Sequence, residues 1–482
     1  MKKLKQNWAL LPHNFRRIDS HYLVSSLWGG WVVLSEDEFL KVNQFAIREN
    51  SALFRKLKRS SLVIDESTFL GFVEKYRAQH ASLFWDAGLH IAVVTEQCNF
   101  SCRYCQADAT SRANQMGFEV ATRVLGCLFA SANQSVRLEL QGGEPLLNWP
   151  TVKFLVIHAR RQNKFEKKNL SISLVTNCSL LDQTKLNFLV THGVEICTSL
   201  DGPREIHDLN RIFTSGQGTH DMVVSCLGNI RKAYRKRGIK NPFIGALPTV
   251  TRQMLEYPKL LIDEYLRLGF DVVNLRPLSS LGRAGNNWEQ IGYSPDEFNA
   301  FWRDAMDYII ALNKRGIRIK EGLAAHMLTK IIGRKDPLYV DLDSPCGAGR
   351  SQLAYSPNGD VFTCDEARML KNDMFKLGNV LHNSYGEIVK NHNLFYTSQS
   401  SLLNLWDYNS AFCAWSGTCP VLNYHEQCNP VVKITQTARY KISNFQFDYL
   451  FRNILHDKVA YRIFQSWILN KESVCLRKKV VK

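Results

Sequence analysis

Short apolar runs alternate with longer amphipathic stretches from about residue 88 to residue 278. Compact apolar runs bounded by turn residues predict strands, and apolar residues that recur every three or four positions predict helices. The predicted strands are 90–95, 136–141, 170–176, 194–200, 243–249 and 272–278, and the helices between them include 118–132, 150–163, 182–191, 219–236 and 257–268.

Strands that alternate with helices predict an α/β fold with a parallel sheet and right-handed crossovers. The count of six strands favours a partial (β/α)6 barrel over a closed eightfold barrel. In such folds the chemistry lies at the carboxyl ends of the strands. The residues that follow each strand are therefore the candidates for a functional site.

The residues before this region predict a small separate unit. Two apolar runs flank Gly29 and Gly30 within residues 21–35, which indicates a hairpin. Ser35, with Glu38 three residues further on, then predicts the start of a capped helix.

A chain of 482 residues corresponds to about three domains of ordinary size. After a helical connector at 295–335, cysteines return amid Gly, Pro and Asn. We predict an N-terminal domain at 1–85, a barrel domain at 86–335, a cysteine-rich domain at 336–430 and a mixed, partly helical extension at 431–482.

Composition excludes some classes of protein. The start has a basic cluster without an apolar run of 7–15 residues, so we expect no signal peptide. No stretch reaches 18 apolar residues, so we expect no membrane span and a cytoplasmic protein. The net charge of +17 favours acidic partners, but the basic residues are spread along the chain, so nucleic acid is not the expected partner. Thirteen cysteines without a secretory signal favour metal binding or catalysis over disulfides.

Three cysteines follow the first predicted strand with Cys-x3-Cys-x2-Cys spacing: Cys98, Cys102 and Cys105. Cysteine thiolates normally hold cubane iron–sulfur clusters in fours, so three of them leave one iron open. An open metal position is typical of a catalytic site. The alternative is a structural zinc site, which usually shows Cys-x2-Cys pairs and four protein ligands.

A Gly-Gly-Glu-Pro sequence ends the second predicted strand. Gly142 and Gly143 allow close approach of the backbone to a ligand, and Glu144 offers a carboxylate to an ammonium group. Taken alone, these residues predict no more than a turn. Placed one strand–helix unit after the three cysteines, they indicate a shared site.

Together these two motifs resemble the radical S-adenosylmethionine (SAM) superfamily. Thr176-Asn177 after the third strand, Ser199-Leu-Asp201-Gly-Pro after the fourth and Arg276-Pro-Leu after the sixth fit the same resemblance. These motifs are similar to those of the subgroup that modifies peptides and proteins, which includes anaerobic sulfatase maturases.

The resemblance implies roles for individual residues. The three cysteines would hold a [4Fe–4S] cluster whose open iron binds SAM. The residues implied to contact SAM are Gly142, Gly143 and Glu144 at its ammonium, Tyr104 beside the adenine, and Asn177, Ser199 and Arg211 at the sugar and carboxylate. Cys178 departs from the family, which often has glycine at this position.

The later cysteines resemble the auxiliary-cluster (SPASM) domain of this subgroup. Five are present where seven are usual: Cys346, Cys364, Cys413, Cys419 and Cys428. We expect one or two auxiliary iron–sulfur clusters, with an open position or a ligand such as His425 in place of the missing cysteines. A zinc ribbon is the alternative. Asp365 matches the position of a general base in sulfatase maturases; as an isolated residue it predicts only a surface turn.

The N-terminal unit resembles winged-helix-like elements that capture the leader of a precursor peptide by strand addition. Several short sequence segments are similar to those of the maturases of His-Xaa-Ser peptide systems. The resemblance implies oxidative modification of a ribosomally made peptide or protein, by cross-linking or side-chain oxidation, with a reductant such as flavodoxin or ferredoxin. The alternatives are a radical SAM enzyme that modifies RNA and a non-catalytic iron–sulfur or zinc regulatory protein.

Overall fold

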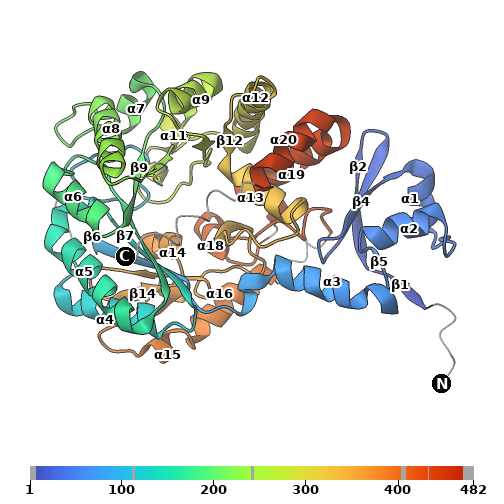
Figure 1. The fold of residues 1–482 in the computed structure, drawn as a ribbon, viewed down its shortest axis with the longest axis horizontal. Coiled ribbons are helices and arrows are strands. Elements are labelled where there is room, and N and C mark those ends of the chain that lie inside the picture. Colours follow the sequence, from blue (N-terminus) through green and yellow to red (C-terminus); the bar gives the residue numbers. More distant parts are fainter. Residues whose placement is uncertain (1–6, 111–113, 240–243, 403–408, 433, 470–482) are drawn as a thin grey trace.

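The computed structural model describes residues 7–110, 114–239, 244–402, 409–432 and 434–469 (Figure 1). Its centre is an eight-stranded sheet in the order β10-β9-β8-β7-β6-β13-β14-β15. The strands are β6 (Leu89–Thr95), β7 (Ser135–Gly142), β8 (Asn169–Val175), β9 (Val194–Ser199), β10 (Ile244–Leu247), β13 (Gln352–Tyr355), β14 (Asp360–Phe362) and β15 (Lys376–Asn379).

The first five strands of this sheet in chain order are parallel and neighbour one another in sequence order, as predicted. The chain returns between them through helices. These helices are α4 (Phe118–Ala130), α5 (Trp149–Glu166), α6 (Gln183–Thr191), α7 (Arg204–Asn210) and α8 (His220–Lys236). α9 (Pro258–Arg267) follows β10.

Side-chain alternation along each strand decides which face is covered. On β7, Val136, Leu138 and Leu140 are buried in a core that also contains residues of α4, α5, α6 and α8. The intervening Arg137 and Glu139 point to the other face and stay partly exposed. Figure 1 shows these helices along the outer side of the sheet. The inner face of β7 is therefore polar and partly exposed.

The predicted sixth strand differs from the expectation. β11 spans only Val272–Val273 and pairs with β12 (Lys320–Glu321), outside the main sheet. Pro277 lacks the N–H that a longer ladder needs. A single parallel bridge between Thr249 and Arg276 keeps this segment beside the residues that follow β10.

A helical layer follows the sixth strand. It contains α10 (Arg283–Asn286), α11 (Trp288–Ile291), α12 (Pro295–Lys314) and α13 (Gly322–Ile331). These helices share a large apolar core with the two last helices of the described chain, α19 (Ala438–His456) and α20 (Lys458–Leu469).

The N-terminal residues form a separate small sheet, β2-β3-β4, and a second strand pair, β1-β5. Ser35 caps α1 in a capping box with Glu38, as predicted. The elements are β1 (Trp8–Leu10), β2 (His13–Ile18), β3 (His21–Ser26), β4 (Trp31–Ser35), α1 (Glu36–Asn43), α2 (Ala52–Arg59), β5 (Val63–Asp65) and α3 (Glu66–Gln79).

This N-terminal sheet rests on α19. Arg16 of β2 pairs with Asp448 at 2.7 Å. The Trp31 ring meets the Phe451 ring edge-on at 5.2 Å, and its Nε1–H donates to the carbonyl of Ile331 at 3.0 Å. The unit thus has its own core and is also joined to the rest of the molecule through α13 and α19.

The cysteine-rich region continues the main sheet. β13 pairs with β6 in parallel, and β14 and β15 extend the edge in antiparallel fashion. Its helices are α14 (Asp365–Leu370), α15 (Tyr385–Ile388), α16 (His392–Leu402) and α18 (Pro420–Gln427). Within the described ranges, none of the helices has the length and apolar character needed to cross a membrane.

Candidate active site

The three-cysteine loop, residues 98–105, follows β6 directly at the carboxyl end of the parallel strands. Its backbone is hydrogen-bonded to the end of α7 and to the segment that follows. The N–H of Ser101 donates to the carbonyl of Ile212 at 2.8 Å, and that of Arg103 to the carbonyl of Asn210 at 3.0 Å. The loop is therefore fixed to the residues that follow the fourth strand.

Arg283 holds the other side of the three-cysteine loop. Its backbone N–H donates to the carbonyl of Cys105 at 2.9 Å, and its side chain donates to the carbonyl of Cys102 at 3.3 Å and pairs with Asp108 at 3.3 Å. Gly282 adopts φ +59°, and a Cβ there would lie 2.2 Å from the carbonyl oxygen just after the loop. Sequence reasoning missed both residues; the Leu-Gly-Arg sequence after the sixth strand was the available signal.

The Gly–Gly–Glu turn, residues 142–144, lies against the start of the loop. Gly143 N–H donates to the carbonyl of Thr95 at 2.9 Å, and Glu144 N–H donates to that of Gln97 at 2.7 Å. A Cβ on Gly142 would lie 2.3 Å from the oxygen of Thr95, and one on Gly143 would lie 2.3 Å from that of Gln97. Both positions therefore require glycine, and the two motifs form one unit.

The carboxylate of Glu144 is fully buried and ties the second strand to the third. It accepts hydrogen bonds from Leu146 N–H at 2.9 Å, Thr176 Oγ1 at 2.8 Å and Asn177 N–H at 2.7 Å. Burial raises the pKa of Glu144 to about 7, against the effect of these bonds. A carboxylate has about four acceptor positions, so one remains for a cationic ligand group.

Asn177 faces the three-cysteine loop. Its Nδ2 donates to Asn99 at 2.9 Å and lies 3.9 Å from the Sγ of Cys98. The next residue, Cys178, is buried and has φ +70°. A positive φ is adopted most easily by glycine, which accounts for the glycine that the family often has at this position. In this chain the small side chain of Cys178 occupies the position.

Tyr104 and Arg211 meet at the base of the three-cysteine loop. The Tyr104 hydroxyl donates to Asp201 at 2.6 Å and accepts from Nη1 of Arg211 at 2.8 Å. Arg211 is 7% exposed, and its Nε has no hydrogen-bond acceptor among the described residues. Ser199 ends β9 nearby in the chain and stays partly exposed.

The electrostatics of the loop suit metal binding. Burial raises the pKa of Cys98, and it raises that of Cys102 to about 12, while the positive charge of Arg211 acts in the opposite direction on both. Metal ligation requires the thiolate, so a bound cluster would have to displace these protons. A buried guanidinium beside the loop stabilises the negative charge that results.

These observations fit a [4Fe–4S] cluster with SAM as its partner. Three thiols lie on one loop, two obligatory glycines lie against it, and the buried Nε of Arg211 lacks an acceptor that a carboxylate supplies. All seven residues predicted to contact SAM lie at the carboxyl ends of the strands or in the segments that follow them.

Among the later cysteines, the structure groups three and separates two. Cys346, Cys364 and Cys419 share one small apolar cluster. Cys413 instead receives a hydrogen bond from Asn14 of the N-terminal sheet at 3.6 Å. Cys428 is exposed at the end of α18.

Cys364 and Cys419 occupy equivalent places in two helices. Each is the N-cap of its helix, α14 and α18, and the Sγ of Cys364 accepts a hydrogen bond from Ala367 N–H at 3.3 Å. The neighbouring Asp365 pairs with Arg368 at 2.9 Å. Glu366 lies 3.8 Å from Arg276, which follows the sixth strand.

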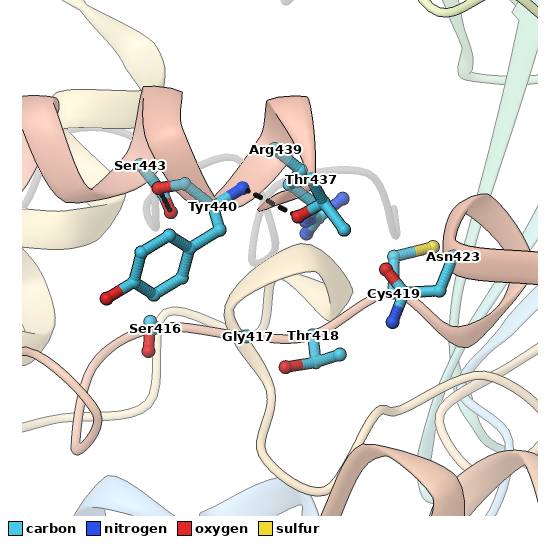
Figure 2. A pocket seen from close by; sticks show the side chains of 9 residues that line it. All are labelled: Ser416, Gly417, Thr418, Cys419, Asn423, Thr437, Arg439, Tyr440 and Ser443. Atoms are coloured by element: carbon cyan, nitrogen blue, oxygen red, sulfur yellow. Dashed lines mark hydrogen bonds between the residues drawn. The ribbon is translucent and has the colours of Figure 1, made fainter. Parts of the chain in front are cut away.

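A polar hollow opens beside Cys419, under the start of α19 (Figure 2). Arg439 of its lining donates to the backbone carbonyl of Asp341 at 2.6 Å. The hollow is lined by Ser416, Gly417, Thr418, Cys419, Asn423, Thr437, Arg439, Tyr440 and Ser443. One of the three grouped cysteines thus has a partly open, hydroxyl-rich side.

His425, the predicted substitute ligand, lies near the barrel instead. Its Nε2 is 3.0 Å from the hydroxyl of Ser280. In the part of the chain that the structure describes, no three His, Cys, Asp or Glu side chains converge on the position of a single metal ion.

Comparison with known proteins identifies the barrel region. Residues 92–257 match the model of the radical SAM superfamily. The chain is 25% identical over 321 residues to a cysteine-type anaerobic sulfatase-maturating enzyme of Clostridium perfringens, covering 63% of this chain and 81% of that one. It is 27% identical over 275 residues to an uncharacterized protein of Archaeoglobus fulgidus, covering 56% of this chain and only 60% of that protein.

Two solved structures share the fold. The enzyme anSMEcpe with bound AdoMet superposes with a TM-score of 0.65 at 18% identity, covering 78% of this chain and 100% of the other. Streptococcus suis SuiB bound to its precursor peptide SuiA gives a TM-score of 0.55 at 13% identity, covering 88% and 98%. Residues 92–257 thus match the radical SAM superfamily, and the two structures show that the chain shares its fold with anSMEcpe and SuiB.

Proposed function

We propose that this protein is a radical SAM maturase that oxidatively modifies a ribosomally made peptide or protein. The observation that carries the proposal is the joint construction of the three-cysteine loop and the Gly–Gly–Glu turn. When bound, the cluster and SAM supply a one-electron reductive cleavage and a 5′-deoxyadenosyl radical that removes a hydrogen atom from the substrate.

The protein's own residues bind and orient these groups. Cys98, Cys102 and Cys105 would hold the [4Fe–4S] cluster. The turn would receive the SAM ammonium, since Glu144 keeps one acceptor position and Gly142 and Gly143 leave no side chain in the way. Asn177, Ser199, Tyr104 and Arg211 would border the rest of SAM, as the resemblance implies.

We further propose one auxiliary iron–sulfur cluster at Cys346, Cys364 and Cys419, because these side chains share one apolar cluster. Cys413 and Cys428 remain the candidates for a second. Such a cluster would relay an electron away from the oxidised substrate toward an acceptor.

Asp365 remains the candidate for the proton acceptor during that oxidation. Its place at the start of α14, directly after Cys364, supports the assignment. Its ion pair with Arg368 would hold the carboxylate in a fixed orientation.

Peptide substrates are proposed from two observations. The fold matches that of two enzymes solved with bound peptides, anSMEcpe with the Cp18Cys peptide and SuiB with its precursor peptide SuiA. The N-terminal sheet, the predicted winged-helix-like domain over 1–85, also offers strands for β-addition of a leader.

The remaining domains are proposed with the bounds that the sequence predicts. Residues 86–335 would form the barrel, 336–430 the SPASM-type domain and 431–482 an extension. Flavodoxin or ferredoxin would be the reductant.

The test is SAM cleavage by the reconstituted protein without oxygen. Dithionite-reduced protein should release 5′-deoxyadenosine from SAM, and Cys98→Ala should abolish the release. Cys127→Ala is the matched control, since Cys127 lies in α4 among the covering helices and should leave turnover intact. Equal turnover by wild type and Cys98→Ala would overturn the proposal.

The net charge of +17 supports RNA as a second candidate substrate. Binding to RNA would weaken steeply with added salt, because Lys and Arg release counterions from phosphates. Modification of a precursor peptide with no such salt dependence would exclude this alternative.

A further inference from the structure

A buried set of side chains joins the three-cysteine loop to the residues after β9. We call it the Tyr104 network, and none of its members is more than 7% exposed. It consists of Tyr104, Asp201, His207, Arg211 and Thr219.

One arm of the network links the two opposite charges through a hydroxyl. Tyr104 donates to one carboxylate oxygen of Asp201 at 2.6 Å and accepts from Arg211 at 2.8 Å. The other oxygen of Asp201 accepts from Thr249 N–H at 3.0 Å. The phenol therefore lies between the carboxylate and the guanidinium and fixes their separation.

The second arm fixes the backbone on both sides. The N–H of Asp201 donates to Nδ1 of His207 at 3.2 Å, which assigns the ring proton to Nε2. Nε2 then donates to the Thr219 hydroxyl at 3.0 Å, and that hydroxyl donates to the carbonyl of Arg211 at 2.8 Å. Burial lowers the pKa of His207 to about 2, so the ring is neutral and adds no charge to the network.

The guanidinium of Arg211 packs on the three-cysteine loop itself. Its Cζ lies 5.8 Å from the ring centroid of Phe100 and 5.9 Å from that of Tyr104, and both rings belong to the loop. The charge is buried there, so solvent screens it less than it would a surface charge.

We propose that the Tyr104 network sets the reduction potential of the cluster at the three-cysteine loop, by fixing the charge of Arg211 beside it and opposing that charge with Asp201. The inference rests on the proposed function, because it requires a cluster at this loop. Tyr104 and Asp201 are then positioning residues, and Arg211 supplies the field.

The sign of each contribution follows from electrostatics. Reduction moves one electron from the external reductant to the cluster, which takes it from the 2+ to the 1+ state and makes it more negative. A nearby cation stabilises the reduced form and raises the potential, whereas an anion lowers it. Arg211 touches the loop, and Asp201 lies behind the Tyr104 hydroxyl, so the cation has the larger effect.

The test is an anaerobic redox titration of the full chain, followed by electron paramagnetic resonance. The cluster of the loop is the one whose signal changes when SAM is added. We expect a lower midpoint potential in Arg211→Gln, a higher one in Asp201→Asn, and a value close to wild type in Arg211→Lys. A general loss of packing would not move the first two in opposite directions.

Two further variants complete the test. Tyr104→Phe keeps the ring and removes only the hydroxyl, so we expect a shift in the direction of Arg211→Gln. Arg204→Gln is the matched control. Arg204 lies on α7, the helix that Arg211 caps at its C-terminal end, and 59% of its side chain is exposed, so its loss should not change the potential.

Equal potentials in all variants that retain the cluster would overturn the inference and leave the proposed function untouched. Failure of the wild-type chain to assemble a cluster that depends on Cys98 would instead overturn the proposed function. The two failures are thus distinguished by iron content and by the Cys98→Ala spectrum.

Discussion

At the scale of single residues, the site depends on positions where no side chain fits. A Cβ on Gly143 would lie 2.3 Å from the backbone oxygen of Gln97 and 2.9 Å from the Cβ of Cys98. Backbone atoms cannot yield as a flexible side chain can. The geometry of the three-cysteine loop therefore depends on a glycine in another strand's turn.

We predict that Gly143→Ala lowers SAM cleavage at least tenfold and destabilises the fold by about 1–3 kcal/mol, as overpacking typically does. Gly126→Ala is the control, because Gly126 is exposed on α4 with open space around its Cα. That change should stabilise the protein by roughly 0.5–1 kcal/mol through helix propensity. Thermal unfolding and 5′-deoxyadenosine release measure both, and equal activity in the two variants would contradict the prediction.

A second residue links pH to stability. Glu321 is fully buried at the N-cap of α13 and accepts hydrogen bonds from the N–H groups of Leu275, Leu323 and Ala324. Burial nevertheless raises its pKa from the ordinary 4.5 to about 7. Between these values the folded state binds more protons than the unfolded state, so the free energy of unfolding falls as pH rises.

We predict that the contribution of Glu321, present below about pH 4.5, declines until about pH 7 by roughly 3 kcal/mol, at 1.36 kcal/mol per pKa unit. Urea unfolding at pH 5 and pH 7.5 should show this decline in wild type and a smaller one in Glu321→Gln. Glu387→Gln, a change at an exposed helix start, should keep the full decline. A Glu321→Gln variant with the wild-type pH dependence would contradict the assignment.

At the scale of elements, periodicity predicted most of the barrel. The predicted strand at 136–141 is β7 (Ser135–Gly142), and the helix at 219–236 is α8 (His220–Lys236). The prediction of the sixth strand was wrong in its length and its pairing. An apolar run does not show that Pro277 lacks a backbone N–H or that β12 is the partner strand. Pairing of β13 with β6 was also outside the reach of local pattern.

The site residues that lie in local motifs were predictable, whereas those that act through long-range contacts were not. Cys98 and Glu144 lie in spaced motifs that can be read from the chain. Arg283 and Asp201 act through contacts with residues 181 and 97 positions away. Arg283 stands in no motif that we identified, and the motif that contains Asp201 did not indicate this contact. Long-range hydrogen bonds of this kind become visible only in the folded molecule.

The helix starts at Cys364 and Cys419 lead to a prediction about iron content. Cys364→Ala should reduce the iron of the anaerobically reconstituted protein by about four per chain, because one cluster of the [4Fe–4S] type would be lost. Cys428→Ala should lose less, since Cys428 lies outside the apolar cluster that contains Cys364. Iron and sulfide analysis with Mössbauer spectra measures the change, and equal loss in both variants would contradict the grouping.

At the scale of the whole molecule, the N-terminal unit is joined to the rest by ion pairs, side-chain hydrogen bonds and apolar packing, to which Ile18 and Leu23 contribute. Trp31 contributes both a ring contact with Phe451 and a hydrogen bond to Ile331. Trp28 of the same hairpin instead meets Phe72 within the N-terminal unit, with ring centroids 6.2 Å apart. Substitution of each tryptophan therefore tests one property: Trp31 the attachment of the unit to the rest of the molecule, and Trp28 the internal stability of the unit.

We predict that Trp31→Ala keeps most of the SAM cleavage by the barrel but lowers modification of the precursor peptide at least tenfold. The loss of a partly buried tryptophan costs about 3 kcal/mol at this junction, which should also expose the chain after α3 to protease. Trp28→Ala should leave that segment resistant. Limited proteolysis and mass analysis of the peptide test this, and unchanged peptide modification in Trp31→Ala would contradict it.

The pairing of β13 with β6 also has a consequence for biosynthesis. Gln352 pairs with Leu89, so the ribosome adds 352 − 89 = 263 residues after Leu89 until Gln352 is made. At 5–20 residues per second, translation leaves the edge of β6 without its neighbour for roughly 13–53 s. An unpaired edge is a template for aggregation. Nascent chains that stop before residue 355 should therefore need chaperone protection, and the length of this delay sets how long each newly made molecule depends on it.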